Sequence, residues 1–287
     1  MTMLRRTPPP RGAGLAFDHV SLTKRGPTLA MQVPEGSSLA IMGPAASGKS
    51  RMLAAACGSS EPVRGSVSRL DDTFIVGDLE WSRRDTPSSI AREIIGRTGA
   101  QRVTDALTTL NLWEVRQKAC NSLSPTQQQA LAFLPVLLKS PSLVATDSGL
   151  DSLDLLTLEG LWSAMSLLRR QGTILAYTTQ RPDLGERADI VLVIKDEQVV
   201  FSGTPEALKR TAAETEIEVF TDDKPGVRAL SDPFEVSIEE FELGLKMRAR
   251  EGQALAARLL LEGYGDVKYI IQRPPSFAEA LAVLMNR

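Results

Sequence analysis

Short apolar runs alternate with amphipathic stretches from residue 38 to about residue 205. Runs of this length without polar interruption are typical of strands that are buried on both faces of a sheet. The strand-like runs cover residues 38–42, 73–76, 143–146, 173–177 and 190–194. The helical patterns between them cover residues 48–56, 88–97, 103–110, 126–138 and 155–170. Strands that alternate with helices predict an α/β domain with a largely parallel sheet.

The pattern changes after residue 205. Strand-like runs now fall at residues 216–220, 235–246 and 267–272, with helical patterns at 252–262 and 276–285. This order predicts a small α+β domain as a C-terminal extension over residues 211–287, linked through residues 209–214.

The first 14 residues are rich in arginine and proline and contain no apolar stretch, so they predict a flexible tail. We therefore expect the α/β domain to cover residues 15–210. Within it, the helical patterns at about residues 82–140 predict a helical subdomain.

The 287 residues have an ordinary globular composition, with 43% hydrophobic and 24% charged residues. The net charge of -2 supplies no general electrostatic attraction to nucleic acid or to an anionic membrane surface. His19 is the only histidine, and Cys57 and Cys120 are the only cysteines, so a disulfide framework, a histidine-based metal site and a protease triad are disfavoured. No apolar run approaches the roughly 18 residues of a membrane span. These features predict a cytoplasmic protein that does not bind nucleic acid.

Residues 43–50 read Gly-Pro-Ala-Ala-Ser-Gly-Lys-Ser and match the phosphate-loop pattern G-x-x-x-x-G-K-[ST] between a predicted strand and a predicted helix. Backbone N–H groups of such a loop wrap a phosphate, the lysine reaches the β and γ oxygens, and the last hydroxyl ligates Mg²⁺. The residues that we expect to bind nucleotide here are Gly43, Pro44, Ala45, Ala46, Ser47, Gly48, Lys49, Ser50 and Arg51.

Several segments, in chain order, resemble the nucleotide-binding subunits of ABC transporters. They are residues 17–24, the phosphate loop, and residues 123–129, 143–147, 152–154 and 188–205. The resemblance covers about residues 15–210 and implies a P-loop NTPase (ABC ATPase) domain that binds ATP and Mg²⁺, with Ser50 and Asp147 holding the metal. Residues 275–281 also resemble the closing helix of C-terminal extensions in the drug-, lipid- and polysaccharide-export branch.

The signature segment departs from the family pattern. The family places the sequence LSGGQ against the ATP of a partner subunit, whereas residues 123–127 read Leu-Ser-Pro-Thr-Gln. Loss of both glycines hinders the close backbone approach to a γ-phosphate. Ser124 and Gln127 remain candidate contacts, because Ser124 can cap a helix whose N-terminus keeps its partial positive charge. The alternative is a capped helix with no nucleotide contact.

Two catalytic positions also depart from the family. Ser148 stands where the family has the glutamate that activates water, and Gln180 stands where it has the histidine that contacts the γ-phosphate. The spacing from Asp147 to Asp154 matches the spacing between the family's two aspartates, which argues against a slipped alignment. Asp151 remains a possible substitute for the missing carboxylate.

Two further family positions have changed. Gly77 and Asp78 replace the glutamine that follows the second strand-like run, and Arg25 replaces the aromatic residue that stacks on adenine. An arginine guanidinium can stack on the base in its place, and a solvated surface arginine is the alternative. Near these positions, Leu79 and Trp81 are candidates for the docking of a membrane partner.

Together these observations predict an ATP-binding subunit of an ABC transporter with impaired hydrolysis. We expect it to pair with a second, competent ATPase subunit, a different chain rather than another copy, beneath an integral membrane permease on the inner face of the cell membrane. The alternatives are an active ATPase homodimer that drives export, with Gln180 or Asp151 replacing the lost groups, and a soluble ATP-dependent regulator or adaptor.

Overall fold

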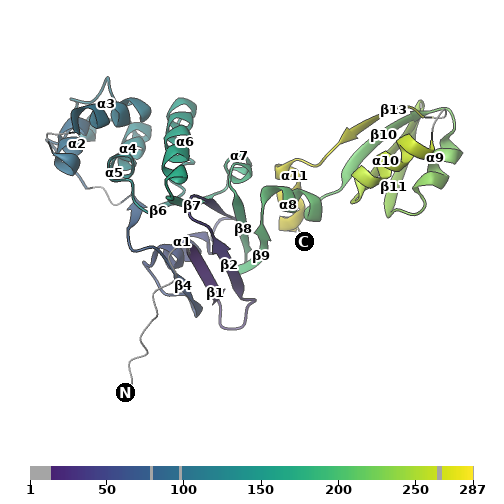
Figure 1. The fold of residues 1–287 in the computed structure, drawn as a ribbon, viewed down its shortest axis with the longest axis horizontal. Helices are drawn as coiled ribbons and strands as arrows, with labels where there is room; N and C mark the ends of the chain where they lie inside the picture. The colour runs from purple at the N-terminus through teal and green to yellow at the C-terminus, as the bar shows by residue number, and fades with distance from the viewer. Residues whose placement is uncertain (1–13, 78–79, 97–98, 264–266, 287) are drawn as a thin grey trace, which may run out of the picture. The chain divides into compact units, whose positions relative to one another are not determined.

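The computed structural model describes residues 14–77, 80–96, 99–263 and 267–286, and its contacts divide the chain into two compact units between Ser202 and Gly203 (Figure 1). The expected tail over residues 1–14 therefore lies outside the described residues, apart from Gly14. None of the described helices is long and apolar enough to cross a membrane.

A six-stranded sheet forms the centre of the first unit (Figure 1). Its strand order is β5 (Thr73–Val76), β6 (Leu143–Asp147), β7 (Ile174–Thr179), β3 (Ser38–Met42), β8 (Ile190–Lys195) and β9 (Gln198–Gly203). The pairs from β5 to β8 are all parallel. Every residue of β3 and β7 is buried, which explains their uninterrupted apolar sequences. The predicted parallel α/β sheet is confirmed.

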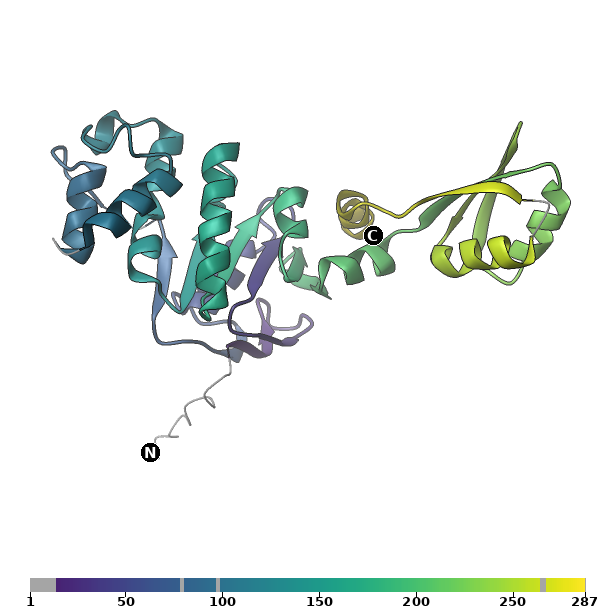
Figure 2. The same cartoon turned by 45° about the horizontal axis from the view of Figure 1, so that its top comes forward.

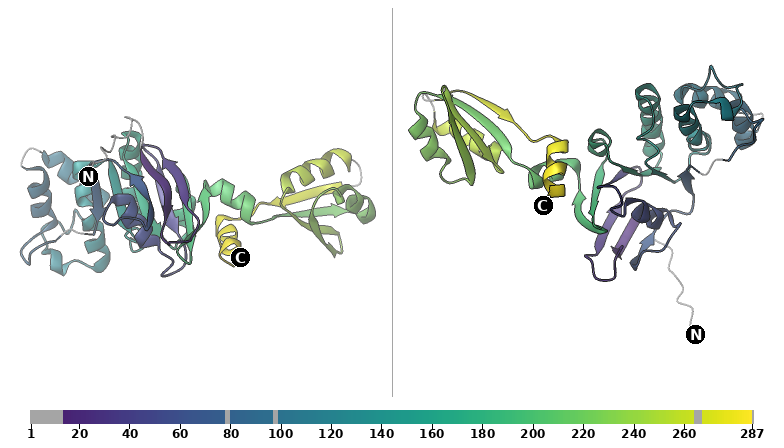
Figure 3. Two further views of the ribbon diagram at one scale, coloured as in Figure 1. Left: turned by 90° about the horizontal axis from the view of Figure 1, so that it is seen from below. Right: turned by 180° about the vertical axis from the view of Figure 1, so that it is seen from behind.

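A second, antiparallel sheet of the first unit has the order β2 (Leu29–Val33), β1 (Leu15–Ser21) and β4 (Arg64–Ser68) (Figure 3). The apolar pattern did not predict these strands, because β4 buries only Val67 and the alternation in β1 is interrupted where its pairing register shifts. One hydrophobic core joins this sheet to the central sheet through helix α1 (Lys49–Cys57), which buries Met52 and Ala56 between them.

Helices cluster around residues 87–139 and form the expected helical subdomain (Figure 2). They are α2 (Pro87–Ile95), α3 (Ala100–Thr109), the short 3₁₀ helix η2 (Cys120–Ser122), α4 (Pro125–Ala132) and α5 (Leu134–Lys139). The single helix predicted over residues 126–138 is wrong. It is interrupted at Phe133, because Pro135 lacks the N–H that would continue the helical hydrogen bonds and is tolerated only in a first turn. Two more helices, α6 (Leu155–Arg170) and α7 (Pro182–Glu186), flank β7 along the chain.

The second unit contains a four-stranded antiparallel sheet of order β11-β12-β10-β13, with helices α9 and α10 on one face (Figure 2). In chain order its elements are β10 (Thr215–Thr221), α9 (Lys224–Ser231), β11 (Val236–Phe241), β12 (Gly244–Ala249), α10 (Gly252–Glu262) and β13 (Val267–Arg273). This β-α-β-β-α-β order defines a ferredoxin-like fold. The small α+β domain is confirmed, but the strand predicted over residues 235–246 is in fact the hairpin of β11 and β12, and helix α9 was not predicted.

Helices α8 (Pro205–Ala212) and α11 (Phe277–Asn286) pack together beside this sheet within the second unit. Leu208 of α8 and Phe277 and Ala280 of α11 are all buried. The boundary expected after residue 210 falls within α8, and the packing of α8 against α11 groups the whole helix with the second unit.

Candidate functional site

The phosphate loop connects the buried strand β3 to helix α1, as the sequence pattern requires. Gly43 has a φ of 150° and Gly48 has a φ of 101°, both in the region that favours glycine. A side chain at Gly43 would also lie 2.0 Å from the carbonyl oxygen of Ile194 and 2.7 Å from the Ser47 Oγ. Both positions therefore favour glycine through their backbone conformation. At Gly43 the loop also passes close to the backbone of β8.

Lys49 lies across this loop and is only 7% exposed. Its Nζ donates to the carbonyl oxygens of Gly43, at 3.0 Å, and Pro44, at 2.6 Å. Burial lowers the pKa of Lys49, while the charges of Asp147 and Asp151 act in the opposite direction. The ammonium group is thus held over the loop and faces two carboxylates.

The loop fits a bound phosphate on two further observations. The Ser47 Oγ is buried and has no hydrogen-bond partner in the described part of the chain, although buried polar groups are normally paired. Ser50 is exposed at the start of α1, so its hydroxyl is available as an oxygen ligand. The loop residues therefore suit a nucleotide phosphate with Mg²⁺.

Two threonines at the end of β7 fix the loop that follows β6. The Thr178 hydroxyl donates to the Asp147 Oδ1 and accepts from the backbone N–H of Ser148 at 2.9 Å. Ser148 adopts a left-handed backbone with a φ of 54°, and its own Oγ lies 3.4 Å from the Thr178 Oγ1. Asp147 and Ser148 are both exposed, so their side chains lie at the surface at the carboxyl end of the sheet.

The next threonine makes a similar contact. The Thr179 hydroxyl donates to the Asp151 Oδ1 at 2.6 Å, and the backbone N–H of Gln180 donates to the Asp151 Oδ2 at 3.3 Å. Sequence reasoning missed both threonines, although the Thr-Thr pair at the end of a buried strand was a visible polar signal. The structure therefore brings Lys49, Asp147, Asp151 and the backbone of Gln180 to one edge of the sheet.

The signature segment forms a closed capping box at the start of α4. The Ser124 Oγ accepts from the backbone N–H of Gln127 at 3.2 Å, and the Gln127 Oε1 accepts from the backbone N–H of Ser124 at 3.0 Å. Pro125 at the first helical position has no N–H to offer. The side chains of Ser124 and Gln127 thus satisfy donors of their own helix.

Two arginines named from the sequence lie on the β1 side of the phosphate loop. Arg25 is exposed between β1 and β2. Arg51 donates to the carbonyl oxygen of Leu22 at 3.1 Å and pairs with Glu197 at the turn between β8 and β9. Arg51 is therefore anchored to the neighbouring backbone, whereas Arg25 is available to stack on a base.

Asp78 and Leu79 lie outside the described residues, and Gly77, which follows β5, has a φ of 125°. The indole Nε1 of Trp81 donates to the Asn121 Oδ1 at 3.0 Å. Trp81 is therefore fixed against the segment that precedes α4.

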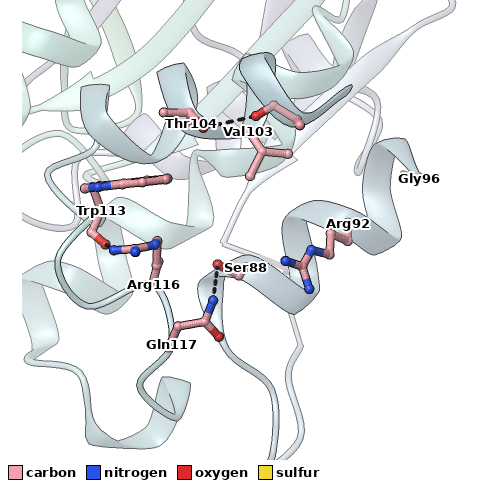
Figure 4. A pocket seen from close by; sticks show the side chains of 9 residues that line it. Ser88, Arg92, Gly96, Val103, Thr104, Trp113, Arg116 and Gln117 are labelled. Carbon is pink, nitrogen blue, oxygen red and sulfur yellow. Dashed lines mark hydrogen bonds between the residues drawn. The ribbon is translucent and has the colours of Figure 1, made fainter. Parts of the chain in front are cut away.

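A cavity of about 410 Å³ lies between α2, α3 and the segment that follows α3 (Figure 4). The guanidinium of Arg116 lies 4.0 Å from the ring centroid of Trp113, and the Gln117 Nε2 donates to the Ser88 Oγ at 3.3 Å. Arg92 extends toward the same space from α2, and none of the described residues that line it is acidic. The helical subdomain therefore has a cationic pocket that is separate in sequence from the phosphate loop.

The parallel sheet with its phosphate loop after β3 defines a P-loop nucleotide-binding protein of the α/β class. A family model described as ABC transporter matches residues 27–150. The aliphatic sulfonates import ATP-binding protein SsuB 2 of Rhodococcus jostii is 31% identical over 179 residues, which cover 60% of this chain and 73% of that protein. The cytochrome c biogenesis ATP-binding export protein CcmA of Gluconobacter oxydans is 27% identical over 172 residues, covering 60% of this chain and 77% of that protein.

A solved structure of the ATP-binding subunit of an ABC transporter has the same fold, with a TM-score of 0.59 and 20% identity over 68% of this chain and 92% of that one. Taken with the sequence matches, this similarity identifies the chain as a member of the ABC transporter ATP-binding family. Subunits of this family bind ATP with Mg²⁺, dimerise and pair with a permease.

Proposed function

We propose that this ATP-binding subunit binds MgATP through residues 43–50 and Asp147 but hydrolyses it slowly, and that it works opposite a competent ATPase subunit beneath a separate permease. Lys49 would carry positive charge to the β and γ oxygens, and Ser50 with Asp147 would hold the metal, which neutralises phosphate charge when bound. The buried Ser47 hydroxyl, which has no hydrogen-bond partner among the described residues, supports nucleotide binding at this loop.

One observation carries the proposal of slow hydrolysis. Ser148 occupies the position after Asp147, and its backbone is fixed there by the Thr178 hydroxyl. A serine hydroxyl does not accept a proton near pH 7, and loss of a general base typically costs about 10²- to 10⁴-fold in rate. The Gln180 amide can donate a hydrogen bond but cannot take up a proton as an imidazole can.

The capping box at the start of α4 supports pairing with a different subunit. Ser124 and Gln127 close on their own helix, so this chain's signature segment offers few free N–H donors to the nucleotide of a partner. A closed dimer is still favoured by ATP if the partner's signature segment faces this chain's phosphate loop. Leu155 and Leu156, which are 69% and 76% exposed, give α6 an apolar start that a second subunit can cover.

We place the permease contact on the helical subdomain, near Trp81. The cytoplasmic location on the inner face of the membrane would follow from this contact. The motif at residues 275–281, which begins α11 with a capping box between Ser276 and Glu279, supports an assignment to the export branch. Purification from detergent with a multi-span protein tests this assembly, and a chain that purifies without one favours the soluble regulator.

Replacing Lys49 by alanine tests nucleotide binding. We expect the Kd for MgATP to rise at least about tenfold, because hydrogen bonds to charged groups contribute about 1.5–3 kcal/mol. Titration with a fluorescent ATP analogue measures the change. Lys139→Ala, which removes an exposed lysine at the end of α5, is the control and should leave the Kd unchanged. Retained affinity in Lys49→Ala would contradict binding at this loop.

Restoring the two catalytic side chains tests the reason for slow hydrolysis. We expect the double variant Ser148→Glu, Gln180→His to turn over ATP at least about tenfold faster than the natural chain, because it regains a carboxylate base. Phosphate release measures turnover. Serine already carries the cost of the left-handed backbone at position 148 and glutamate would carry it too, so a thermal unfolding curve accompanies the assay. Turnover at the rate normal for the family in the natural chain contradicts the proposal.

The competing function is an active homodimer that uses Asp151 as the base, and the position of this carboxylate beside Gln180 is the observation in its favour. Asp151→Asn distinguishes the two. If turnover in the natural chain is substantial and disappears in Asp151→Asn, the homodimer is correct.

A further inference from the structure

Two arginine side chains line the cavity in the helical subdomain, and both have N–H groups that bond to no described residue. Arg92, in the last turn of α2, has no side-chain hydrogen-bond or ion-pair partner in the part of the chain that the structure describes. Arg116 uses one nitrogen, Nη1, to donate to the carbonyl oxygen of Trp113 at 2.7 Å, and its guanidinium lies over the Trp113 ring. The cavity therefore offers positive charge and several hydrogen-bond donors.

A buried hydroxyl lines the same cavity. Ser88 is only 5% exposed, and its Oγ accepts a hydrogen bond from the Gln117 Nε2 at 3.3 Å. A serine hydroxyl can also donate one hydrogen bond, and the Ser88 O–H has no acceptor among the described residues. Buried polar groups are normally paired. This donor is thus available to an acceptor that enters the cavity.

The fold brings these groups around one space. Ser88 and Arg92 are four residues apart in α2, so they lie on the same face of that helix. The backbone N–H of Ser88 donates to the carbonyl oxygen of Arg116 at 3.0 Å, which fixes the segment after α3 against the start of α2. In the view of Figure 4 the Ser88 hydroxyl lies between the two guanidinium groups. An anionic group at this hydroxyl is therefore attracted from both sides.

The cavity is large enough for more than a single ion. Its volume of about 410 Å³ lies within the range of about 300–1,000 Å³ that is common for small-molecule sites. Ala100 and Val103 of α3 give one side of the cavity a nonpolar lining. A ligand can therefore place an anionic group near α2 and an apolar part against α3.

We propose that this cavity is a binding site for a small organic anion. The Arg92 guanidinium and the Ser88 hydroxyl bind its carboxylate or phosphate group, because the planar fork of arginine donors matches the oxygens of both groups. Arg116, which is held in place by Trp113, adds positive charge and its remaining N–H groups. The inference does not depend on nucleotide binding at residues 43–50.

Calorimetric titration of the full chain with benzoate and with phenyl phosphate tests this site. Saturating MgADP is present, so that the phosphate loop does not take up the phosphate probe. We expect saturable binding of at least one probe, and the one that binds more tightly shows which anionic group the site prefers. Arg92→Gln and Ser88→Ala should each raise its Kd at least about tenfold, because a hydrogen bond to a charged group contributes about that factor or more in affinity.

Lys118→Gln is the matched control. It removes the same charge from an exposed residue nearby that is not part of the cavity lining, so the Kd should stay unchanged. Arg92 is itself exposed, so Arg92→Gln should keep the fold and stays decisive if Ser88→Ala lowers stability. A thermal unfolding curve for each variant checks this point.

Three results overturn the inference. They are the absence of saturable binding of either probe, an unchanged Kd in Arg92→Gln, and an equal loss of affinity in Arg92→Gln and Lys118→Gln. The last result would show that the probes respond only to the net charge of the chain.

Discussion

At the scale of single residues, the loops of the candidate site hold non-glycine residues in left-handed backbone conformations. Ala46 in the phosphate loop has a φ of 59°, and Ser148 after β6 has a φ of 54°. A side chain in this conformation costs about 1–2 kcal/mol relative to the right-handed form. The surrounding hydrogen bonds outweigh this cost and fix both loops.

Ala46→Gly should increase the free energy of unfolding of the first unit by about 0.5–1 kcal/mol, because relief of the left-handed strain exceeds the added entropy of the unfolded chain. Urea denaturation measures the change. Ala45→Gly is the control, since Ala45 has no positive φ, and it should lower stability by about 0.4–1 kcal/mol. Equal effects at the two positions would show that strain at Ala46 is absent.

The sequence alone predicted Lys49, Ser50 and Asp147 as site residues, because a contiguous motif or a strand end carries them. It could not predict the contacts of Thr178 and Thr179. Those hydrogen bonds depend on the register between β6 and β7, and the residues that they join are separated by about 30 positions in the chain.

At the scale of elements, helix starts were easier to predict than helix ends. The long pattern over residues 155–170 became α6 with the predicted bounds, because Asp154 caps it. The pattern over residues 126–138 contained Pro135, and the break there depends on local backbone geometry that apolar periodicity does not report. The apolar pattern did not predict β1 and β4 either, because buried and exposed side chains do not alternate regularly along these strands.

The Asp154 N-cap of α6 should stabilise the fold to a degree that depends on pH. Hydrogen bonds from the backbone N–H and hydroxyl of Thr157 lower the pKa of Asp154. A carboxylate with a lowered pKa stabilises the fold above its unfolded pKa, about 3.9, and loses this effect as the pH falls through the folded value. Asp154→Ala should therefore cost about 1 kcal/mol at pH 7 and less at pH 3. Urea unfolding at both pH values measures the difference.

Asp154→Asn separates charge from capping in the same experiment. Asparagine caps helices about as well as aspartate but does not titrate, so its effect should be small and similar at both pH values. A cost for Asp154→Ala that does not depend on pH would contradict the role of the carboxylate charge.

At the scale of the whole molecule, each unit has a hydrophobic core of its own. The first core surrounds α1, and the second lies between the sheet of the ferredoxin-like unit and its helices, with Ile217, Leu245 and Leu259 at its centre. The order of elements predicted both units in outline. The hairpin within residues 235–246 was hidden because Glu242 and Leu243 form a turn without glycine, proline or asparagine.

Two cores predict two separate unfolding transitions in calorimetry. A free MgATP concentration of about 100 times the Kd should stabilise the nucleotide-binding unit by about 2.7 kcal/mol. Only the unfolding transition of that unit should then move to a higher temperature. The second transition should stay at the same temperature. A joint shift of both transitions would show that the two units unfold together.

The hydrogen-bonded loops at the carboxyl edge of the central sheet have a consequence for how this protein can change over evolutionary time. Residues 43–50, 147–151 and 178–180 extend from β3, β6 and β7, whose packing is complete without the exposed side chains of Ser148 and Gln180. Mutation at these two positions is therefore free of the packing constraint that acts on the strands. A few substitutions at these positions can therefore lower or raise the rate of ATP turnover while the fold of the domain is kept.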